Sequence, residues 1–114
     1  MILSVGEKLH VVYRAMFEQS TRRHFIGEVT AVDGAMCRLE GYAYVYDTKS
    51  TMFVRKPEKR ITIIDASESG YIINVINTDV VLNDVVYRYI QNVGLIATDN
   101  KAFSLDINEF SAKS

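Results

Sequence analysis

Apolar and polar side chains alternate with a period of two residues along much of this chain, in short stretches separated by polar turns. From Leu9 to Phe17 one face of such a stretch is entirely apolar, and the alternation returns from Arg22 to Val32. Successive side chains of a β-strand point to opposite faces of its sheet, so this period is typical of half-buried strands. Enrichment in β-branched and aromatic residues predicts further strands at 35–47, 52–55, 61–65 and 71–76. The chain is therefore expected to be mainly β.

A glycine and a turn indicate how these strands would be arranged. Gly27 lies inside the second predicted strand, where a glycine marks strong bending or the close approach of two backbones. Asp33-Gly34 follows at the end of that strand, and both residue types tolerate the positive φ of a tight hairpin turn. Short strands with a bend and tight turns favour a small, strongly bent five-stranded barrel over a sandwich.

The C-terminal third has a different pattern. Apolar residues between Thr78 and Val93 fall at helical spacing, Thr78 can cap the first turn, and Gly94 stands where a helix would stop. The apolar stretches 95–98 and 102–106 flank three polar residues and predict a hairpin. The sequence therefore predicts one helix and one hairpin in this part of the chain.

Length and composition fit one ordinary globular domain. The 114 residues are 48% apolar and 24% charged, which excludes a disordered chain. We expect a barrel core over residues 1–70, with an extension of strand, helix and hairpin over 71–114 packed on the same domain. No apolar run reaches the roughly 20 residues that span a bilayer. No signal peptide is visible at the start, and one cysteine cannot form an intrachain disulfide. We therefore expect a cytoplasmic protein.

The charge is unevenly distributed along the chain. Residues 1–60 carry a net charge of +3 and residues 61–114 a net charge of −4, which gives −1 overall. A strongly basic domain would indicate nucleic-acid binding, whereas here the positive charge is local, at 22–24 and 55–60. Such clusters are most often solvated turns. A nucleic-acid site would require both clusters to lie on one face or around one pore.

Residues suited to catalysis are few. His10 and His24 are the only histidines, and each lies within a strand pattern, which is typical of a hydrogen-bonded or surface histidine. Cys37 stands in an apolar stretch, as a buried packing residue does. No group of His, Cys and carboxylate residues has metal-ligand spacing, and no glycine-rich loop follows a strand and opens a helix. We therefore expect a non-enzymatic protein without a metal or a small-molecule cofactor.

Binding is the better supported role. Aromatic residues gather before position 54 and are interleaved with basic residues, the combination by which curved sheets bind single-stranded nucleic acid. A second interpretation rests on Tyr42, Tyr44 and Tyr46, which share one face of a predicted strand. A tyrosine stripe of this kind is more often a core edge or a subunit contact.

The segment from Phe25 to Leu39 resembles the first motif of the Sm/LSm family of small barrel proteins. Four residues match the glycine, aspartate, methionine and apolar positions of that motif in order and spacing: Gly27, Asp33, Met36 and Leu39. Residues 53–55, followed by residues 61–64, resemble the second motif of the family more weakly. The resemblance covers residues 8–65.

This resemblance implies a bent barrel whose edge strands pair between neighbouring subunits. The subunits would form a homo-oligomeric ring that binds uridine- or adenine-rich single-stranded RNA in its pore. On the resemblance, Asp33 would orient the base-binding loop, Met36 would lie against a base and Arg55 would approach from the second motif. Arg22 and Arg23 would add positive charge to the same nucleic-acid site.

Two departures from the family pattern leave two hypotheses open. Cys37 replaces the base-recognising asparagine and cannot offer an amide donor and acceptor, and Lys56 replaces the glycine of the second motif. The first hypothesis is single-stranded RNA or DNA binding by a ring. The second is a structural or protein-interaction module that has the barrel without the nucleic-acid site. The positions of Arg22, Arg23 and Arg55 discriminate between them, because a binding pore needs all three together.

Overall fold

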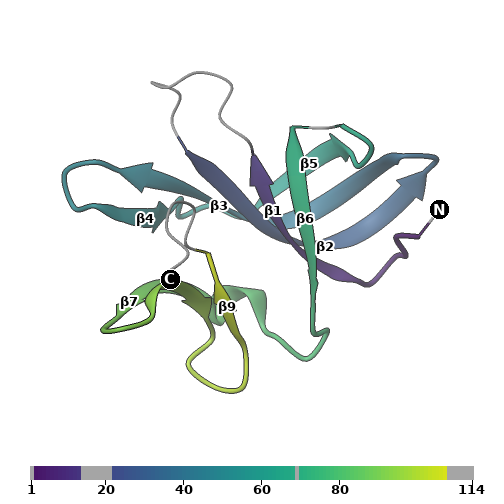
Figure 1. Ribbon diagram of the computed structural model, residues 1–114. Coiled ribbons are helices and arrows are strands. Elements are labelled where there is room, and N and C mark those ends of the chain that lie inside the picture. The colour runs from purple at the N-terminus through teal and green to yellow at the C-terminus, as the bar shows by residue number, and fades with distance from the viewer. Residues whose placement is uncertain (1, 14–21, 69, 108–114) are drawn as a thin grey trace.

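Two antiparallel β-sheets make up the fold in a computed structural model that describes residues 2–13, 22–68 and 70–107 (Figure 1). The first sheet has six strands: β1 (Lys8–Tyr13), β2 (Arg23–Asp33), β3 (Met36–Asp47), β4 (Met52–Arg55), β5 (Arg60–Asp65) and β6 (Tyr71–Ile76). The second sheet has three: β7 (Val86–Ile90), β8 (Gly94–Thr98) and β9 (Ser104–Asp106). The mainly β prediction is confirmed. The first predicted strand is present up to Tyr13, and residues 14–17 lie outside the described residues.

The first sheet curls without closing into a barrel, so the prediction of a closed barrel is wrong. Its strands run in the order β4-β3-β2-β1-β6, and β5 pairs with the other half of β3. Because β1 pairs only with residues 23–28 of β2, the rest of the β2–β3 ribbon extends past β1 together with β5. Among the described residues, no strand pairs with the outer edge of β5 or of β6. The outer edges of β5 and β6 are therefore unpaired in the described chain, and β4 is a further edge strand, which contacts β7.

The bend of the β2–β3 ribbon depends on two glycines that face each other. Gly27 is the direct partner of Gly41 in the antiparallel register. A Cβ atom on Gly41 would collide with the Ile26 carbonyl oxygen, and one on Gly27 would lie 2.7 Å from the Phe25 ring. The prediction of a close approach at Gly27 is confirmed. Gly34, with φ of 61°, begins the two-residue turn into β3.

The helix predicted between Thr78 and Val93 is not present. Its residues form the short 3-10 turn η1 (Leu82–Asp84) and then strand β7. From Val85 to Arg88 burial alternates with a period of two, since Val85 and Tyr87 are buried while Val86 and Arg88 are exposed. Helix propensity is low for valine, and pairing with β8 gives these β-branched residues a sheet neighbour. The hairpin predicted at 95–106 is confirmed as β8 and β9.

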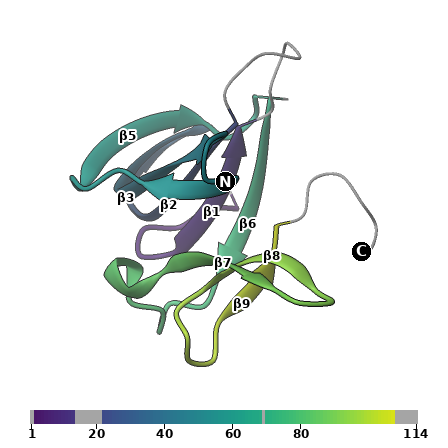
Figure 2. The same cartoon turned by 90° about the vertical axis from the view of Figure 1, so that its left-hand side faces the viewer.

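The central strands bury both of their faces. One face packs inside the curl of the first sheet, in a core that we call the curl core: Leu3, Leu9, Val11, Phe25, Val29, Cys37, Leu39, Ala43 and Ile64. The opposite face packs against the second sheet in an intersheet core: Ile26, Tyr42, Tyr44, Phe53, Ile76, Val80, Val85, Tyr87, Ala97 and Ile107. Figure 2 shows the second sheet lying across one side of the first. The C-terminal part of the chain therefore covers only part of the outer face.

Candidate functional site

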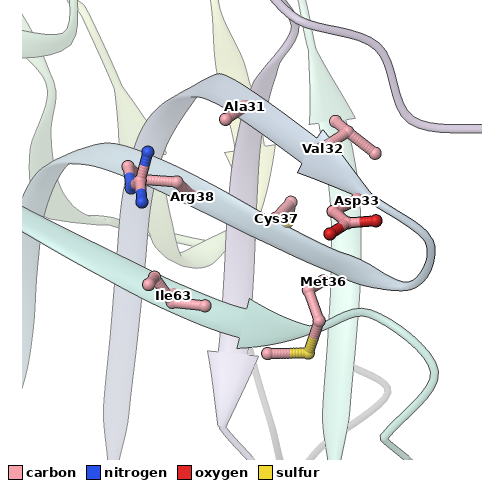
Figure 3. A pocket seen from close by; sticks show the side chains of 7 residues that line it. All are labelled: Ala31, Val32, Asp33, Met36, Cys37, Arg38 and Ile63. Carbon is pink, nitrogen blue, oxygen red and sulfur yellow. The ribbon is translucent and has the colours of Figure 1, made fainter.

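Two of the predicted binding residues lie together at the tip of the β2–β3 ribbon. Asp33 ends β2, Met36 begins β3, and the two are direct register partners. Both line a shallow hollow of about 130 Å³, which Figure 3 shows between β2, β3 and β5. The other lining residues are Ala31, Val32, Cys37, Arg38 and Ile63. The structure therefore brings Asp33 and Met36 to one site, next to the unpaired edge of β5.

Cys37 at the floor of this hollow belongs to the curl core. Its side chain is buried, and burial raises the pKa of the thiol. A thiol that stays protonated is a poor nucleophile and a poor metal ligand. The interpretation of Cys37 as a packing residue is therefore supported by its surroundings.

The predicted arginines lie elsewhere and contact other parts of the chain. The Arg55 guanidinium stacks over the Tyr42 ring at 4.6 Å and donates a 2.8 Å hydrogen bond to the Asn83 carbonyl, which joins β4 to the η1 turn. The Arg22 guanidinium lies 4.1 Å from the centre of the Tyr46 ring. Both contacts are on the intersheet side of the first sheet.

Arg23 lies on the opposite side of the sheet. It is the register partner of Tyr13 and of Val45, and its neighbour His24 faces the intersheet core. Arg23 begins β2 whereas Asp33 ends it, so the two residues lie at opposite ends of an 11-residue strand. The five predicted residues therefore divide into at least three places and do not surround one pore.

The two histidines form a buried polar cluster that joins the two sheets. His10 on β1 and His24 on β2 are each 1% exposed, and His10 Nε2 lies 3.2 Å from His24 Nδ1. The Tyr87 hydroxyl on β7 lies 3.1 Å from His10 Nε2 and 2.8 Å from His24 Nδ1. Asn74 on β6 completes the cluster, with Nδ2 3.2 Å from His10 Nδ1.

One arrangement of protons satisfies this cluster with both imidazoles neutral. The Asn74 amide donates to His10 Nδ1, His10 Nε2–H donates to the Tyr87 oxygen, and the Tyr87 hydroxyl donates to His24 Nδ1. Burial, and then the neighbouring His24, lower the pKa of His10 to about 3. The cluster thus joins the two sheets through hydrogen-bonded side chains, with His10 held neutral by burial. Sequence reasoning missed it, because Tyr87 was assigned to a helix and lies 77 residues from His10.

No metal centre is evident in the part of the chain that the structure describes. No three His, Cys, Asp or Glu residues come close enough there to hold a metal ion. Nor do the described residues contain a helix with the length and apolarity needed to cross a membrane.

The unpaired edges of the first sheet expose apolar side chains. Ile61 and Ile63 on β5 are 68% and 56% exposed, and Ile72 and Val75 on β6 are 50% and 58% exposed. β6 contains no charged residue. An apolar hollow of about 360 Å³ adjoins the β6 edge, lined by Ile2, Leu3, Ala35, Ala66, Ser67, Ile73 and Val75. Natural proteins usually cover such edges or protect them with charged residues, so these edges are candidate contact surfaces.

Comparisons with protein-family models, with curated proteins and with solved structures found no match to this chain.

Proposed function

We propose that the protein is a non-enzymatic interaction module that assembles with copies of itself through its unpaired strand edges. The observation that carries the proposal is the pair of uncovered edges, β5 and β6, on one curled sheet. Each edge presents a row of backbone donors and acceptors beside exposed β-branched side chains. A strand from another molecule would pair with those groups and cover the apolar surface at the same time.

The two edges differ in charge, and the arrangement that we propose pairs β5 with β6. β5 begins with Arg60 and ends with Asp65, whereas β6 is uncharged. A contact between unlike edges leaves one β5 and one β6 edge free at the ends of every dimer. Further copies would add in the same way, and a suitable rotation between subunits would close a ring. The resemblance to the Sm/LSm family supports this arrangement, since that family implies edge pairing between subunits.

The separation of the predicted nucleic-acid residues also supports an interaction module over an RNA-binding pore. Arg22 and Arg55 stack on tyrosines of the same chain, and Arg23 lies on the opposite side of the sheet. Asp33 and Met36 lie at the far tip of the ribbon, beside exposed Ile63. That tip has the mixed apolar and charged character of a protein contact surface.

Sedimentation velocity tests the proposal with charged variants of the β5 edge. At micromolar concentration we expect the wild-type chain to sediment as a multiple of 12.9 kDa. The Ile61→Lys/Ile63→Lys chain should sediment as a monomer, because two charges would have to be buried in the contact. Val81→Lys is the matched control, since Val81 is 52% exposed outside the strands and should leave the assembly unchanged. A wild-type chain that sediments only at 12.9 kDa would exclude self-assembly.

A further inference from the structure

Two tyrosines and an arginine form a row across three neighbouring strands at one end of the curl. Tyr71 on β6 pairs with Tyr13 on β1, and Tyr13 pairs with Arg23 on β2. Direct partners in an antiparallel sheet point to the same face, so the three side chains stand side by side. The centres of the two tyrosine rings are 5.2 Å apart, and the ring planes are tilted by 52°. All three residues are partly exposed at the margin of the curl core.

Arg60, which begins β5 opposite Gly41, lies outside this row in the register and adds a second positive charge that acts on Tyr13. Burial and Tyr71 raise the pKa of Tyr13, whereas the charges of Arg23, its register partner, and of Arg60 both lower it. Among the described residues, no carboxylate forms an ion pair with either arginine. We call Tyr13, Tyr71, Arg23 and Arg60 the tyrosine rim.

The polar groups of the tyrosine rim differ from those of the other tyrosines and arginines. The hydroxyls of Tyr42, Tyr44 and Tyr87 bond Asn83, the Val85 carbonyl and the two histidines. Within the described part of the chain, the hydroxyls of Tyr13 and Tyr71 have no such partner, and they are not buried. Arg55 donates a hydrogen bond to the Asn83 carbonyl, and Arg88 donates one to the Asn100 side chain. Arg23 and Arg60 donate no side-chain hydrogen bond to another described residue. The rim therefore has donors and aromatic surface free for a ligand.

We propose that the tyrosine rim binds a phosphorylated nucleobase, either a free nucleotide or a nucleotide within a single strand. The partly exposed tyrosine ring surface would stack against the base, and the guanidinium groups of Arg23 and Arg60 would contact the phosphate. Stacking on an aromatic ring accepts any base, because every base has a π-face, so the rim would have little sequence preference. Guanidinium groups bind phosphate through paired N–H donors.

This binding is independent of the proposed self-assembly. It also differs from the site that the sequence predicted, because only Arg23 is common to both. The hollow that Asp33 and Met36 line is formed by other residues, and Arg22 and Arg55 stack on tyrosines on the other side of the sheet.

Fluorescence anisotropy of a labelled eight-nucleotide oligoadenylate, at about 50 mM salt, tests the proposal. We expect wild-type binding to weaken as the salt concentration increases. For a single strand, each phosphate contact makes the negative slope of log K against log salt steeper by about 0.7. The Arg23→Gln/Arg60→Gln chain should flatten that slope by about 1.4. Tyr71→Ala should weaken binding roughly 5- to 150-fold, the usual cost of losing one stacking ring.

Matched controls come from the second sheet. Tyr89 is 69% exposed on β7, and Arg88 beside it donates to Asn100, so Tyr89→Ala and Arg88→Gln should bind like wild type. Arg60 is exposed, so Arg60→Gln alone provides the test if Tyr71→Ala fails to fold.

Competition with unlabelled ligands distinguishes the two forms of the nucleotide. If AMP displaces the labelled strand at the same nucleotide concentration as unlabelled oligoadenylate does, the ligand is a free nucleotide. If only oligoadenylate displaces it, the ligand is a single strand. Absence of wild-type binding, or equal binding by wild type and rim variants, would overturn the proposal.

Discussion

Acid should destabilise this protein at pH values where its carboxylates are still ionised, because His10 is buried as a neutral group. The pKa of His10 is lowered from 6.5 to about 3 by burial and by His24. Between those values the unfolded chain binds a proton that the folded chain does not, so stability falls as the pH falls through this range. From pH 7 to pH 5 a single such group costs about 2 kcal/mol of unfolding free energy. That is a large fraction of the roughly 5–15 kcal/mol that stabilises a domain.

Urea denaturation at pH 7 and at pH 5, followed by circular dichroism, measures this loss. His10→Gln is the informative variant, because a glutamine amide can donate to Tyr87 without titrating. We expect this chain to be less stable than wild type at pH 7 and to lose about 2 kcal/mol less than wild type on acidification. The hydrogen bonds of Ser50 and Ser67 lower the pKa values of Asp47 and Asp65, which therefore titrate below this window. Equal stability of wild type at both pH values, or an equal loss in His10→Gln, would refute a buried neutral His10.

Two substitutions test the packing of the first sheet. Gly41→Ala should destabilise the fold by about 3 kcal/mol or more, because the new methyl group would collide with the backbone of β2. Gly70→Ala, whose methyl would meet open space, should have little effect, and equal thermal midpoints for the two chains would contradict the close approach. Tyr44→Phe removes the 2.8 Å hydrogen bond to the Val85 carbonyl and should cost about 1–3 kcal/mol in urea denaturation. An unchanged midpoint would show that this bond does not stabilise the contact between the sheets.

The strands could be predicted from the sequence because alternation and turn residues are local signals. The turns predicted at Asp33-Gly34 and at residues 99–101 both join paired strands. The helix prediction failed at residues 78–93 because a short turn followed by a strand can place apolar residues at the same spacing in the sequence as a helix does. Pairing with β8, which follows later in the chain, selects the strand over the helix at these residues.

Closure of the barrel and the composition of the site could not be predicted, because both depend on contacts between distant residues. The register of β1 on β2 leaves half of β2 without β1 as a neighbour, and no local pattern encodes that offset. The motif residues Asp33 and Met36 do come together, since a two-residue turn joins them. Arg55 instead donates to the Asn83 carbonyl, 28 residues away, and this contact holds it against the η1 turn.

Hydrogen exchange at two protein concentrations tests most directly whether the unpaired edges are contact surfaces. The outward amides of β5 and β6 have no partner strand within the described chain, so in a monomer they should exchange rapidly. We expect peptides covering 60–65 and 71–76 to gain protection as the concentration rises from nanomolar to micromolar, while peptides of β8 stay unchanged. Rapid exchange of both edges at every concentration would contradict assembly through β5 and β6.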